Sequence, residues 1–555
     1  MSRPTAPSPP ATPGPDSGRS AVLVGAGVML SRLSGVLREL VLAGLLGLTV
    51  AADAFKAALQ IPGLLQNVLG EGVLSASFIP VYSDLVESED EDEAGRVAGA
   101  VLGLLGLLTA AIVVLGVVAA RPITRMILPF LADDTYELTV SLVRIMWIGL
   151  GFIVLSAWCL GVLNTHRRFF LSYVAPVLWN AAQVVLALAA WIRDWSLDDI
   201  ARAAAWGVTA GGVLQFAVQL PAVLRVAPRL RISLDRRRPA VRTVIRRFGP
   251  AVLGRGVVQV SAFIDLFLAG LLASGAIAAL SASQVMYLLP IGVFAMGVAA
   301  ADLPELSRER DVDHLIAARL RVGLERVGFF VLFSAVAFVT MGKLVVGALY
   351  QRGEFGADDT ILVWLTLAGY SLGLVGSASS RVLQNACYAR GDVRGPAQLA
   401  AIRVGVAAVL GFALMFQADR LGIVDGSIER LGDLPAFTPL SEGVREDETL
   451  PLRLGAAGLA LGGMVAAWLE YALLKRRVTA QLPRARRLRQ PAWRYLPAAG
   501  VSGALGIIAT IALDGFPPLL AAPIALAVTG VVYVMICARA GSSSARLLLR
   551  AARLG

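Results

Sequence analysis

Charged side chains are scarce in this chain of 555 residues. Asp, Glu, Lys and Arg make up only 16% of it, whereas 57% of the residues are hydrophobic. Because a soluble globular domain carries about 25% charged residues, the deficit argues against a largely soluble protein and predicts an integral membrane protein with many spans. The net charge of +11 would suggest a nucleic-acid partner in a soluble protein. Here cytoplasmic loops rich in Lys and Arg explain it, so no nucleic-acid partner is expected.

Cysteine and histidine are rarer still, which limits the chemistry available. Cys159, Cys387 and Cys537 lie far apart in apolar segments, without the spacing of a metal site, so we expect buried thiols and no metal. His166 and His314 fall in predicted loops beside arginines, where we expect surface positions. The sequence has no phosphate-binding loop and no paired catalytic residues in one segment. It therefore predicts a transporter rather than an enzyme, with no cofactor, driven by the membrane potential or by a gradient of a coupling ion, Na⁺ or H⁺.

Long hydrophobic runs are abundant, and fourteen of them reach the roughly 20 residues needed to span a membrane. The fold class predicted is an all-α integral membrane protein. The second run is unusually polar and is interrupted by proline and glycine, so it is tolerable only where it lines a protein or water cavity. The runs cover residues 20–47, 51–82, 95–119, 138–163, 170–192, 200–226, 244–273, 278–304, 320–349, 360–389, 396–418, 454–475, 492–514 and 517–538.

The charges of the loops predict the orientation of the chain. Loops after even-numbered spans are mostly basic, and "RLRISLDRRRPAVRTVIRR" after span 6 is the most basic stretch. The long loop 419–453, after an odd-numbered span, holds eight Asp and Glu against four Arg. One exception, the acidic stretch "SDLVESEDEDEAGR" after span 2, carries little weight because acidic residues contribute little to orientation. The alternation predicts that both termini are cytoplasmic.

Ionisable residues inside the first two spans form the main candidate site. Arg32, Arg38 and Glu39 lie in span 1, and Asp53 lies in span 2. A charge at mid-bilayer costs about 2.5–3.5 kcal/mol, so its retention needs a reason. At 100° per residue Arg32 and Glu39 share a helix face, with Arg38 about 120° away. The cluster predicts a cationic cavity for an anionic substrate. A structural bond between helices, or side chains reaching the membrane surface, is the alternative.

Other spans supply further candidates. Arg255 and Asp265 lie in the apolar span 7, which resembles the start of the chain in this respect, so a weak symmetry between two halves is expected. Arg381, in span 10, is a further candidate that falls near the predicted inner edge of the membrane.

Several stretches resemble, in order, the MurJ (MviN) lipid II flippases of the MOP exporter superfamily. They are "SRLSGVLRELVLAGLLG…ADAFKAALQIPGLLQNVLGEGVLSASFIPVYSD", "GVLNTHRRFFLSYVAPVLWN", "WGVTAGGVLQFAVQLP", "GPAVLGRGVVQVSAFID", "LYQRGEFGADDT" and "CYARGDVRGP". The resemblance covers roughly residues 20–420. Arg32 and Arg38 match family arginines, Glu39 matches a position that is usually Asp, and Asp53 matches a family Asp.

The resemblance implies a function. The family moves the undecaprenyl-diphosphate-linked peptidoglycan precursor, lipid II, from the inner to the outer leaflet of the bacterial plasma membrane by alternating access. A central cationic cavity takes the diphosphate and sugar, and a groove formed with spans 13 and 14 takes the polyprenyl tail. Lipid II and membrane lipids are the expected partners, with cell-wall synthesis proteins as further candidates.

The resemblance also implies a division of the chain. Two pseudo-symmetric six-helix lobes would surround the cavity, followed by two C-terminal helices. The predicted parts are a disordered cytoplasmic tail 1–19, the N-lobe 20–226, a basic linker 227–243, the C-lobe 244–418, an extracytoplasmic acidic loop 419–453, span 12 at 454–475 completing the C-lobe, a basic cytoplasmic loop 476–491, the two helices of the lipid-tail groove 492–538 and a cytoplasmic tail 539–555.

Two departures from the family pattern concern cavity cations. Gln66 and Asn67 stand where the family usually has one or two arginines, and Val285 stands where it has an arginine in span 8. One hypothesis is that Arg255 substitutes for the missing span 8 arginine, with Arg381 and Gln66 as further cavity positions. The alternatives are a related exporter of another lipid-linked oligosaccharide or of a small molecule, and a scaffold for envelope assembly that transports nothing.

Overall fold

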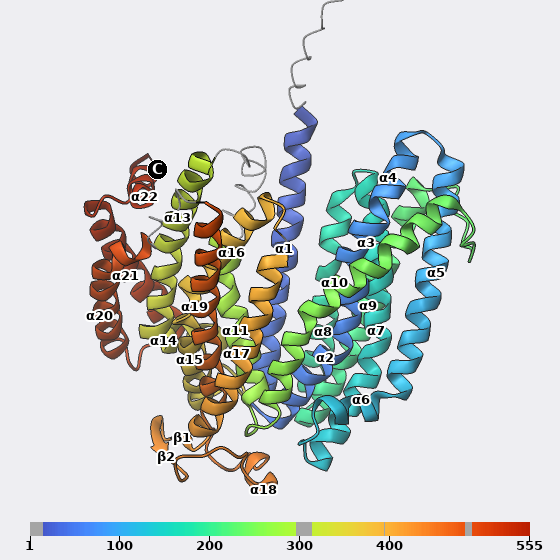
Figure 1. Ribbon diagram of the computed structural model, residues 1–555. Coiled ribbons are helices and arrows are strands. Elements are labelled where there is room, and N and C mark those ends of the chain that lie inside the picture. Colours follow the sequence, from blue (N-terminus) through green and yellow to red (C-terminus); the bar gives the residue numbers. More distant parts are fainter. Residues whose placement is uncertain (1–14, 296–312, 393, 483–490, 555) are drawn as a thin grey trace, which may run out of the picture. The chain divides into compact units, whose positions relative to one another are not determined.

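The structure is a computed structural model that describes residues 15–295, 313–392, 394–482 and 491–554 (Figure 1). Helices dominate the described residues, and one short β-hairpin accompanies them. The predicted tail lies outside the described residues as far as residue 14, and its last five residues begin the first helix. The C-terminal end of the eighth predicted span also lies outside the described residues.

The chain folds into two compact units. The first comprises Met1–Val41, Ala58–Ile123 and Val140–Gln259, and the second comprises Leu42–Ala57, Thr124–Thr139 and Val260–Gly555. The helices of the first half of the chain are α1 (Pro15–Leu46), α2 (Val50–Leu69), α3 (Glu71–Ser77), α4 (Ile79–Glu87), α5 (Glu91–Val118), α6 (Ala120–Ile127), α7 (Asp133–Thr165), α8 (Phe169–Trp191), α9 (Leu197–Val226) and α10 (Pro239–Ala269).

Local sequence signals explain several helix ends in the first unit. The polar second span is broken into α2, α3 and α4, with Pro62 inside α2 and Gly70 at the break before α3. The side chain of Asp90 accepts a hydrogen bond from the backbone N–H of Glu93 at 3.0 Å and so caps α5. Ser196 caps α9 in the same way, through the N–H of Asp199. The broken span therefore appears where the sequence predicts a polar, interrupted helix.

The second unit is built from the later helices and the hairpin. Its remaining elements are α11 (Ala276–Pro290), η1 (Ile291–Ala295), α13 (Asp313–Thr340), α14 (Gly342–Tyr350), α15 (Ala357–Ser371), α16 (Leu374–Ala389), α17 (Arg394–Ala418), β1 (Leu421–Val424), β2 (Ser427–Arg430), α18 (Glu442–Arg445), α19 (Gly455–Gln481), η3 (Pro491–Tyr495), α20 (Leu496–Ala512), α21 (Pro518–Arg539) and α22 (Ser543–Leu554).

Small residues allow close packing in the second unit. Helices α17 and α19 approach so closely that a Cβ added at Gly462 would collide with the backbone of Gly411. The hairpin pairs Leu421 with Arg430 and Val424 with Ser427. Its two-residue turn, Asp425-Gly426, has φ angles of 49° and 76°, the left-handed conformation that a tight hairpin turn requires.

The acidic loop 419–453 explains why two early stretches of the chain belong to the second unit. Arg445 donates hydrogen bonds to the carbonyl oxygens of Gly270 and Phe130, at 3.2 and 2.6 Å. Glu446 accepts from the backbone N–H of Ala132 and from the hydroxyl of Thr135. Glu448 accepts from the N–H of Val50 at 2.6 Å. The loop thereby binds the turns before α2 and α7. The long segment of the second unit begins at Val260, and the lobe boundary at residues 227–243 stays a prediction.

The described residues contain ten helices that are long and apolar enough to cross a membrane, or eleven if the pair α15 and α16, bent by 44°, forms one span. The chain is therefore a multi-pass membrane protein. The predicted spans in α1, α10 and α11 are also helical in the described residues, although these helices do not meet the same criterion. The count of fourteen spans stays a prediction. Helix α19 extends into the predicted basic loop 476–491, of which residues 483–490 lie outside the described residues.

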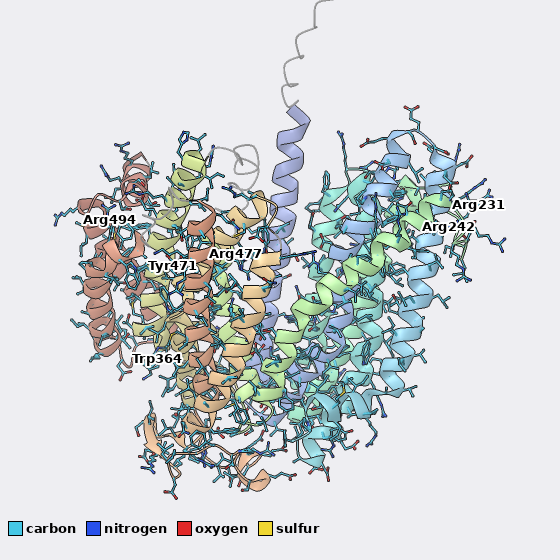
Figure 2. All side chains as sticks on the ribbon, viewed as in Figure 1. Arg231, Arg242, Trp364, Tyr471, Arg477 and Arg494 are labelled. Carbon is cyan, nitrogen blue, oxygen red and sulfur yellow. The ribbon has the colours of Figure 1, made fainter. Side chains whose placement is uncertain are left out.

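Asp392, in the short connection between α16 and α17, ties that connection to the end of α19. Its carboxylate accepts from Arg477 Nε at 2.6 Å, from Arg477 Nη2 at 3.1 Å, from Gln481 at 3.0 Å and from the N–H of Gly395 at 2.9 Å. Figure 2 labels Arg477 on its helix. The hydrogen bonds from Arg477 hold the pKa of Asp392 well below its usual range.

We expect Asp392→Asn to lower the melting temperature of the purified protein in detergent at pH 7. The folded pKa lies below the unfolded value of about 3.9, so the stabilisation is present above pH 4 and is lost as the pH falls further. The difference in melting temperature between wild type and Asp392→Asn should therefore shrink at low pH. The control is Asp433→Asn, because Asp433 makes an exposed ion pair with Arg430 at 3.8 Å. Equal melting temperatures for wild type and Asp392→Asn at pH 7 would refute the assignment.

Candidate substrate-binding site

Arg38 of α1 is the best-formed candidate for binding an anion. Its Nη1 donates a hydrogen bond to Oδ1 of Asn180 in α8 at 3.2 Å, and its guanidinium lies 5.0 Å from the centre of the Trp179 ring. Nη2 lies 3.7 Å from Oε2 of Glu39. The side chain of Arg38 keeps 16% of its surface exposed. Arg38 is thus oriented by α8 and still accessible.

Close packing of α1 on α8 positions this arginine. A Cβ added at Gly27 would lie 3.0 Å from Cβ of Tyr173, so glycine lets the two helices approach each other. One helical turn before Arg38, Ser34 accepts a hydrogen bond from Nδ2 of Asn180 at 2.8 Å. Asn180 therefore bonds both Ser34 and Arg38, and this fixes the oxygen of its amide toward the guanidinium.

The guanidinium of Arg38 has hydrogen-bond donors that can bind a further acceptor. Arginine carries five N–H donors in a fork that matches phosphate and carboxylate oxygens. Nη1 of Arg38 donates to Asn180 and Nη2 lies beside Glu39, whereas the buried Nε has no hydrogen-bond partner among the described residues. Cation–π contact with Trp179 holds the charge in place without using any donor. A diphosphate oxygen could accept from the remaining donors.

The three charges of span 1 differ in exposure. Glu39 is 5% exposed and forms its recorded ion pair with its neighbour Arg38, whereas Arg32 is exposed. Helical angles on α1 do not contain the tertiary contact of Arg38 with Asn180 of α8. Arg32 stays a candidate through its exposure alone.

Arg255 of α10 lies against the broken second span within the first unit. A Cβ added at Gly72, the second residue of α3, would collide with its guanidinium. One turn further along α10, Gln259 accepts a hydrogen bond from Nδ2 of Asn67 at 3.0 Å. Gln66, the neighbour of Asn67, is exposed. The structure thus places the Arg255 charge beside the segment that lacks the family arginines.

Asp53 has a well-defined structural partner in the second unit. Its Oδ2 accepts from the N–H of Gly275 at 2.8 Å, and its Oδ1 accepts from the N–H of Ala278 at 2.7 Å. The carboxylate therefore caps the N-terminus of α11, where unpaired amides and the helix dipole favour a negative charge. Asp53 is 7% exposed. Both of its oxygens bond the protein backbone, and its part in substrate binding stays a prediction.

A polar cluster in the second unit contains two ionisable residues, Arg403 and Glu470, that are not among the predicted site residues. Glu470 of α19 is 2% exposed and accepts from Arg403 of α17 at 3.0 Å and from Gln384 of α16 at 2.9 Å. Asp265 lies close enough to Arg403 for an electrostatic interaction. The exposed Arg381 lies near Tyr287. The signal was available, because Arg403 and Glu470 are ionisable residues inside apolar spans.

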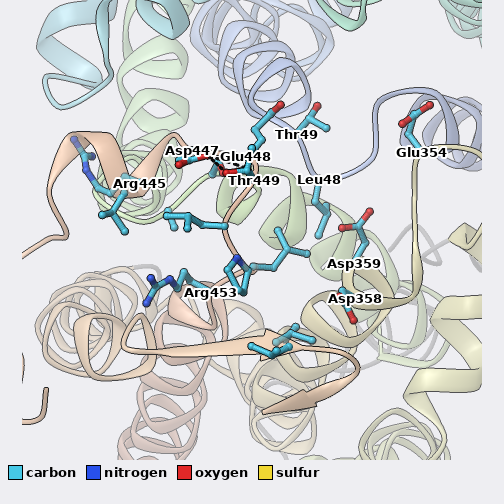
Figure 3. A pocket seen from close by; sticks show the side chains of 18 of the residues that line it. Leu48, Thr49, Glu354, Asp358, Asp359, Arg445, Asp447, Glu448, Thr449 and Arg453 are labelled. Atoms are coloured by element: carbon cyan, nitrogen blue, oxygen red, sulfur yellow. Dashed lines mark hydrogen bonds between the residues drawn. The ribbon is translucent and has the colours of Figure 1, made fainter. Parts of the chain in front are cut away.

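Two cavities of the second unit differ in chemistry. One, of about 420 Å³, lies beside the acidic loop and is shown in Figure 3. Its carboxylates would repel a diphosphate; they are Glu354, Asp358, Asp359, Asp425, Asp447 and Glu448. The other, of about 340 Å³, lies among α13, α16, α19 and the start of α20 and is almost entirely apolar. Leu332, Val336, Val375, Trp468, Trp493 and Leu496 line it.

The sequence of the chain matches the family described as "Lipid II flippase MurJ" over residues 42–426. The chain belongs to the MurJ family. "Probable lipid II flippase MurJ" of Rhizobium tropici is 32% identical over 400 residues, which cover 71% of this chain and 74% of the relative. "Lipid II flippase MurJ" of Burkholderia cenocepacia is 31% identical over 390 residues, which cover 69% of this chain and 75% of the relative. The resemblance stated from the motifs is thereby confirmed.

Solved structures confirm the membrane-transporter fold. "Lipid II flippase MurJ, inward closed conformation" aligns with a TM-score of 0.71 at 19% identity, over 93% of this chain and 99% of the other. A multidrug resistance MATE family transporter of the MOP superfamily, in its inward-facing conformation, aligns with a TM-score of 0.60 at 17% identity, over 84% of this chain and 99% of the other. At these identities the MATE match shows a shared fold and gives no support to drug export.

Proposed function

We propose that this MurJ family chain moves lipid II from the inner to the outer leaflet of the bacterial plasma membrane by alternating access. The family match over residues 42–426 carries this proposal. Arg38 supports it, since an oriented, partly exposed guanidinium with free donors suits the diphosphate of the substrate. The basic loops after even-numbered spans support cytoplasmic positions for both termini.

The apolar cavity beside α20 supports a place for the polyprenyl tail. Trp468 and Trp493 stack with ring centres 5.9 Å apart at its edge, and Leu332 and Val336 form part of its wall. An isoprenoid chain gains free energy in such a cavity in proportion to the apolar area it buries. The energy for transport would come from the membrane potential, which supplies roughly 2.3 kcal/mol per charge for each 100 mV, or from a gradient of Na⁺ or H⁺.

Complementation tests the proposed function. A strain depleted of its own lipid II flippase should grow, with normal cell shape, when it expresses this chain. Lysis despite good expression and correct membrane insertion would favour the alternative, a related exporter of another lipid-linked oligosaccharide or small molecule.

Arg255→Ala should abolish this complementation if Arg255 supplies the cavity charge that Gln66, Asn67 and Val285 lack. Arg255→Lys, which keeps the charge without the planar fork, should support partial growth. The matched control is Arg246→Ala, which removes an exposed arginine from the same helix. Full growth with Arg255→Ala would exclude the substitution hypothesis.

A further inference from the structure

A basic cavity lies in the first unit, where α7 ends, α8 begins and α9 ends. It has a volume of about 400 Å³. Three arginines line it: Arg167 and Arg168 from the turn between α7 and α8, and Arg225 from the last turn of α9. All three are exposed. The cavity therefore concentrates positive charge at one end of two neighbouring spans.

Within the part of the chain that the structure describes, no carboxylate forms an ion pair with these arginines. Other arginines at this end of the unit do form ion pairs: Arg229 lies 3.2 Å from Asp92, and Arg238 pairs with Glu93. The acidic residues at the start of α5 thus pair with arginines of the segment after α9. The cavity arginines can therefore bind an external anion.

The backbone of the turn holds two of these arginines at the cavity. Arg167 adopts a left-handed conformation with φ of 57°, and its N–H donates to the carbonyl of Asn164 at 3.0 Å. The N–H of Arg168 donates to the carbonyl of Leu163 at 2.8 Å. This pattern ends α7 and turns the chain directly into α8. Arg168 is the residue before α8, which has no side-chain cap, so the free amides at the helix start add to the positive potential.

The rest of the cavity wall is apolar. Phe169, Phe170 and Leu171 of α8 and Ala222 and Val226 of α9 complete it. Phe170 is 49% exposed. Further exposed apolar side chains continue along the same two helices, away from the arginines: Leu178 and Val185 on α8, and Leu214 and Val218 on α9. A ligand with a phosphate at one end and hydrocarbon at the other would match this arrangement.

We propose that the cavity of Arg167, Arg168 and Arg225 binds a phosphate group, and that an anionic phospholipid headgroup supplies it. Basic cavities between spans at the cytoplasmic side of a membrane recognise anionic headgroups through their arginines. By the positive-inside rule, the basic loops after even-numbered spans support a cytoplasmic position for this end of α8 and α9. The apolar wall favours a lipid over free phosphate. The site is separate from Arg38 and does not rest on the proposed function.

Native mass spectrometry of the full chain in detergent tests the proposal. Dioleoyl phosphatidylglycerol, dioleoyl phosphatidylcholine and inorganic phosphate are titrated separately, and phosphate is also used as a competitor. The test variant is R167Q/R168Q/R225Q. The matched control, R231Q/R236Q/R242Q, removes the same charge from exposed arginines of the first unit that do not line the cavity. Figure 2 labels Arg231 and Arg242.

Phosphatidylglycerol should bind wild type and the control with equal affinity. Its affinity for the test variant should be lower, on the order of tenfold or more, since each arginine near a headgroup contributes to affinity. The single variant R225Q, with a melting temperature equal to wild type, should show an intermediate loss. Phosphatidylcholine should bind weakly to all. Tighter binding of inorganic phosphate than of phosphatidylglycerol would refute the proposal that a lipid supplies the phosphate group. Equal losses in the test and control variants would overturn the site.

Discussion

Replacing Arg38 with alanine is expected to lower lipid II transport at least about tenfold and to abolish complementation, because a charge-assisted hydrogen bond to a buried anion contributes roughly 1.5–3 kcal/mol. Arg38→Lys should retain part of the activity. Lysine keeps the charge but cannot form the planar fork or the same stacking contact with Trp179. Transport into the outer leaflet and growth of the depleted strain are the two readouts.

A matched measurement separates substrate binding from a structural bond between α1 and α8. Arg38→Ala takes the cation away from the buried carboxylate of Glu39, so the variant to compare is Arg38→Lys, which keeps a cation there; its melting temperature and yield of folded protein should stay close to those of wild type. Arg246→Ala serves as the control for loss of an arginine. A large fall in melting temperature with proportionate loss of transport would assign Arg38 to helix packing. Full transport in Arg38→Ala would remove it from the site.

Replacing Asp53 is expected to have the largest effect on stability. Asp53→Ala leaves the buried amides of Gly275 and Ala278 without their acceptors, at a cost of roughly 1–3 kcal/mol for each amide. Asp53→Asn keeps one carbonyl acceptor and should fall between alanine and wild type. Thermal unfolding of the purified proteins in detergent measures this order of stability: wild type, then Asp53→Asn, then Asp53→Ala.

The control for Asp53 is Asp198→Ala, which removes an exposed carboxylate from the first turn of α9. Its melting temperature should stay within about a degree of wild type, because an exposed substitution changes stability by no more than roughly 0.5 kcal/mol. Unchanged unfolding of Asp53→Ala together with lost transport would assign Asp53 to the substrate instead of to the helix cap.

Apolar runs made the helical segments predictable, because a bilayer admits few alternatives to a helix of about 20 residues. The cost of a charge inside a membrane span singled out Arg38. The same cost applies to Arg403 and Glu470, which were not among the predicted residues. The break at Gly70 followed from local chemistry, whereas Pro62 lies inside α2 without ending it. These features depend on residues that are neighbours in the chain, so they can be predicted from the sequence alone.

Partners remote in sequence could not be predicted. The amides that Asp53 caps lie 222 and 225 residues further along the chain. The contact between Arg38 and Asn180 spans 142 residues. Glu446 and Glu448 bond residues of the stretches 124–139 and 42–57 to the second unit, and they lie in a loop whose composition suggested only its side of the membrane. Helical angles constrain neighbours on one helix and carry no information on the helix opposite.

The most direct test of the central claim is the accessibility of lipid II to an external probe in cells that depend on this chain. Spheroplasts of a flippase-depleted strain are treated with an impermeant lipid II-cleaving enzyme, with and without expression of the chain. The account predicts that externally cleavable lipid II returns with wild type and Arg246→Ala and stays low with Arg38→Ala. Lipid II that remains protected from the enzyme despite abundant, correctly inserted wild-type protein would contradict it.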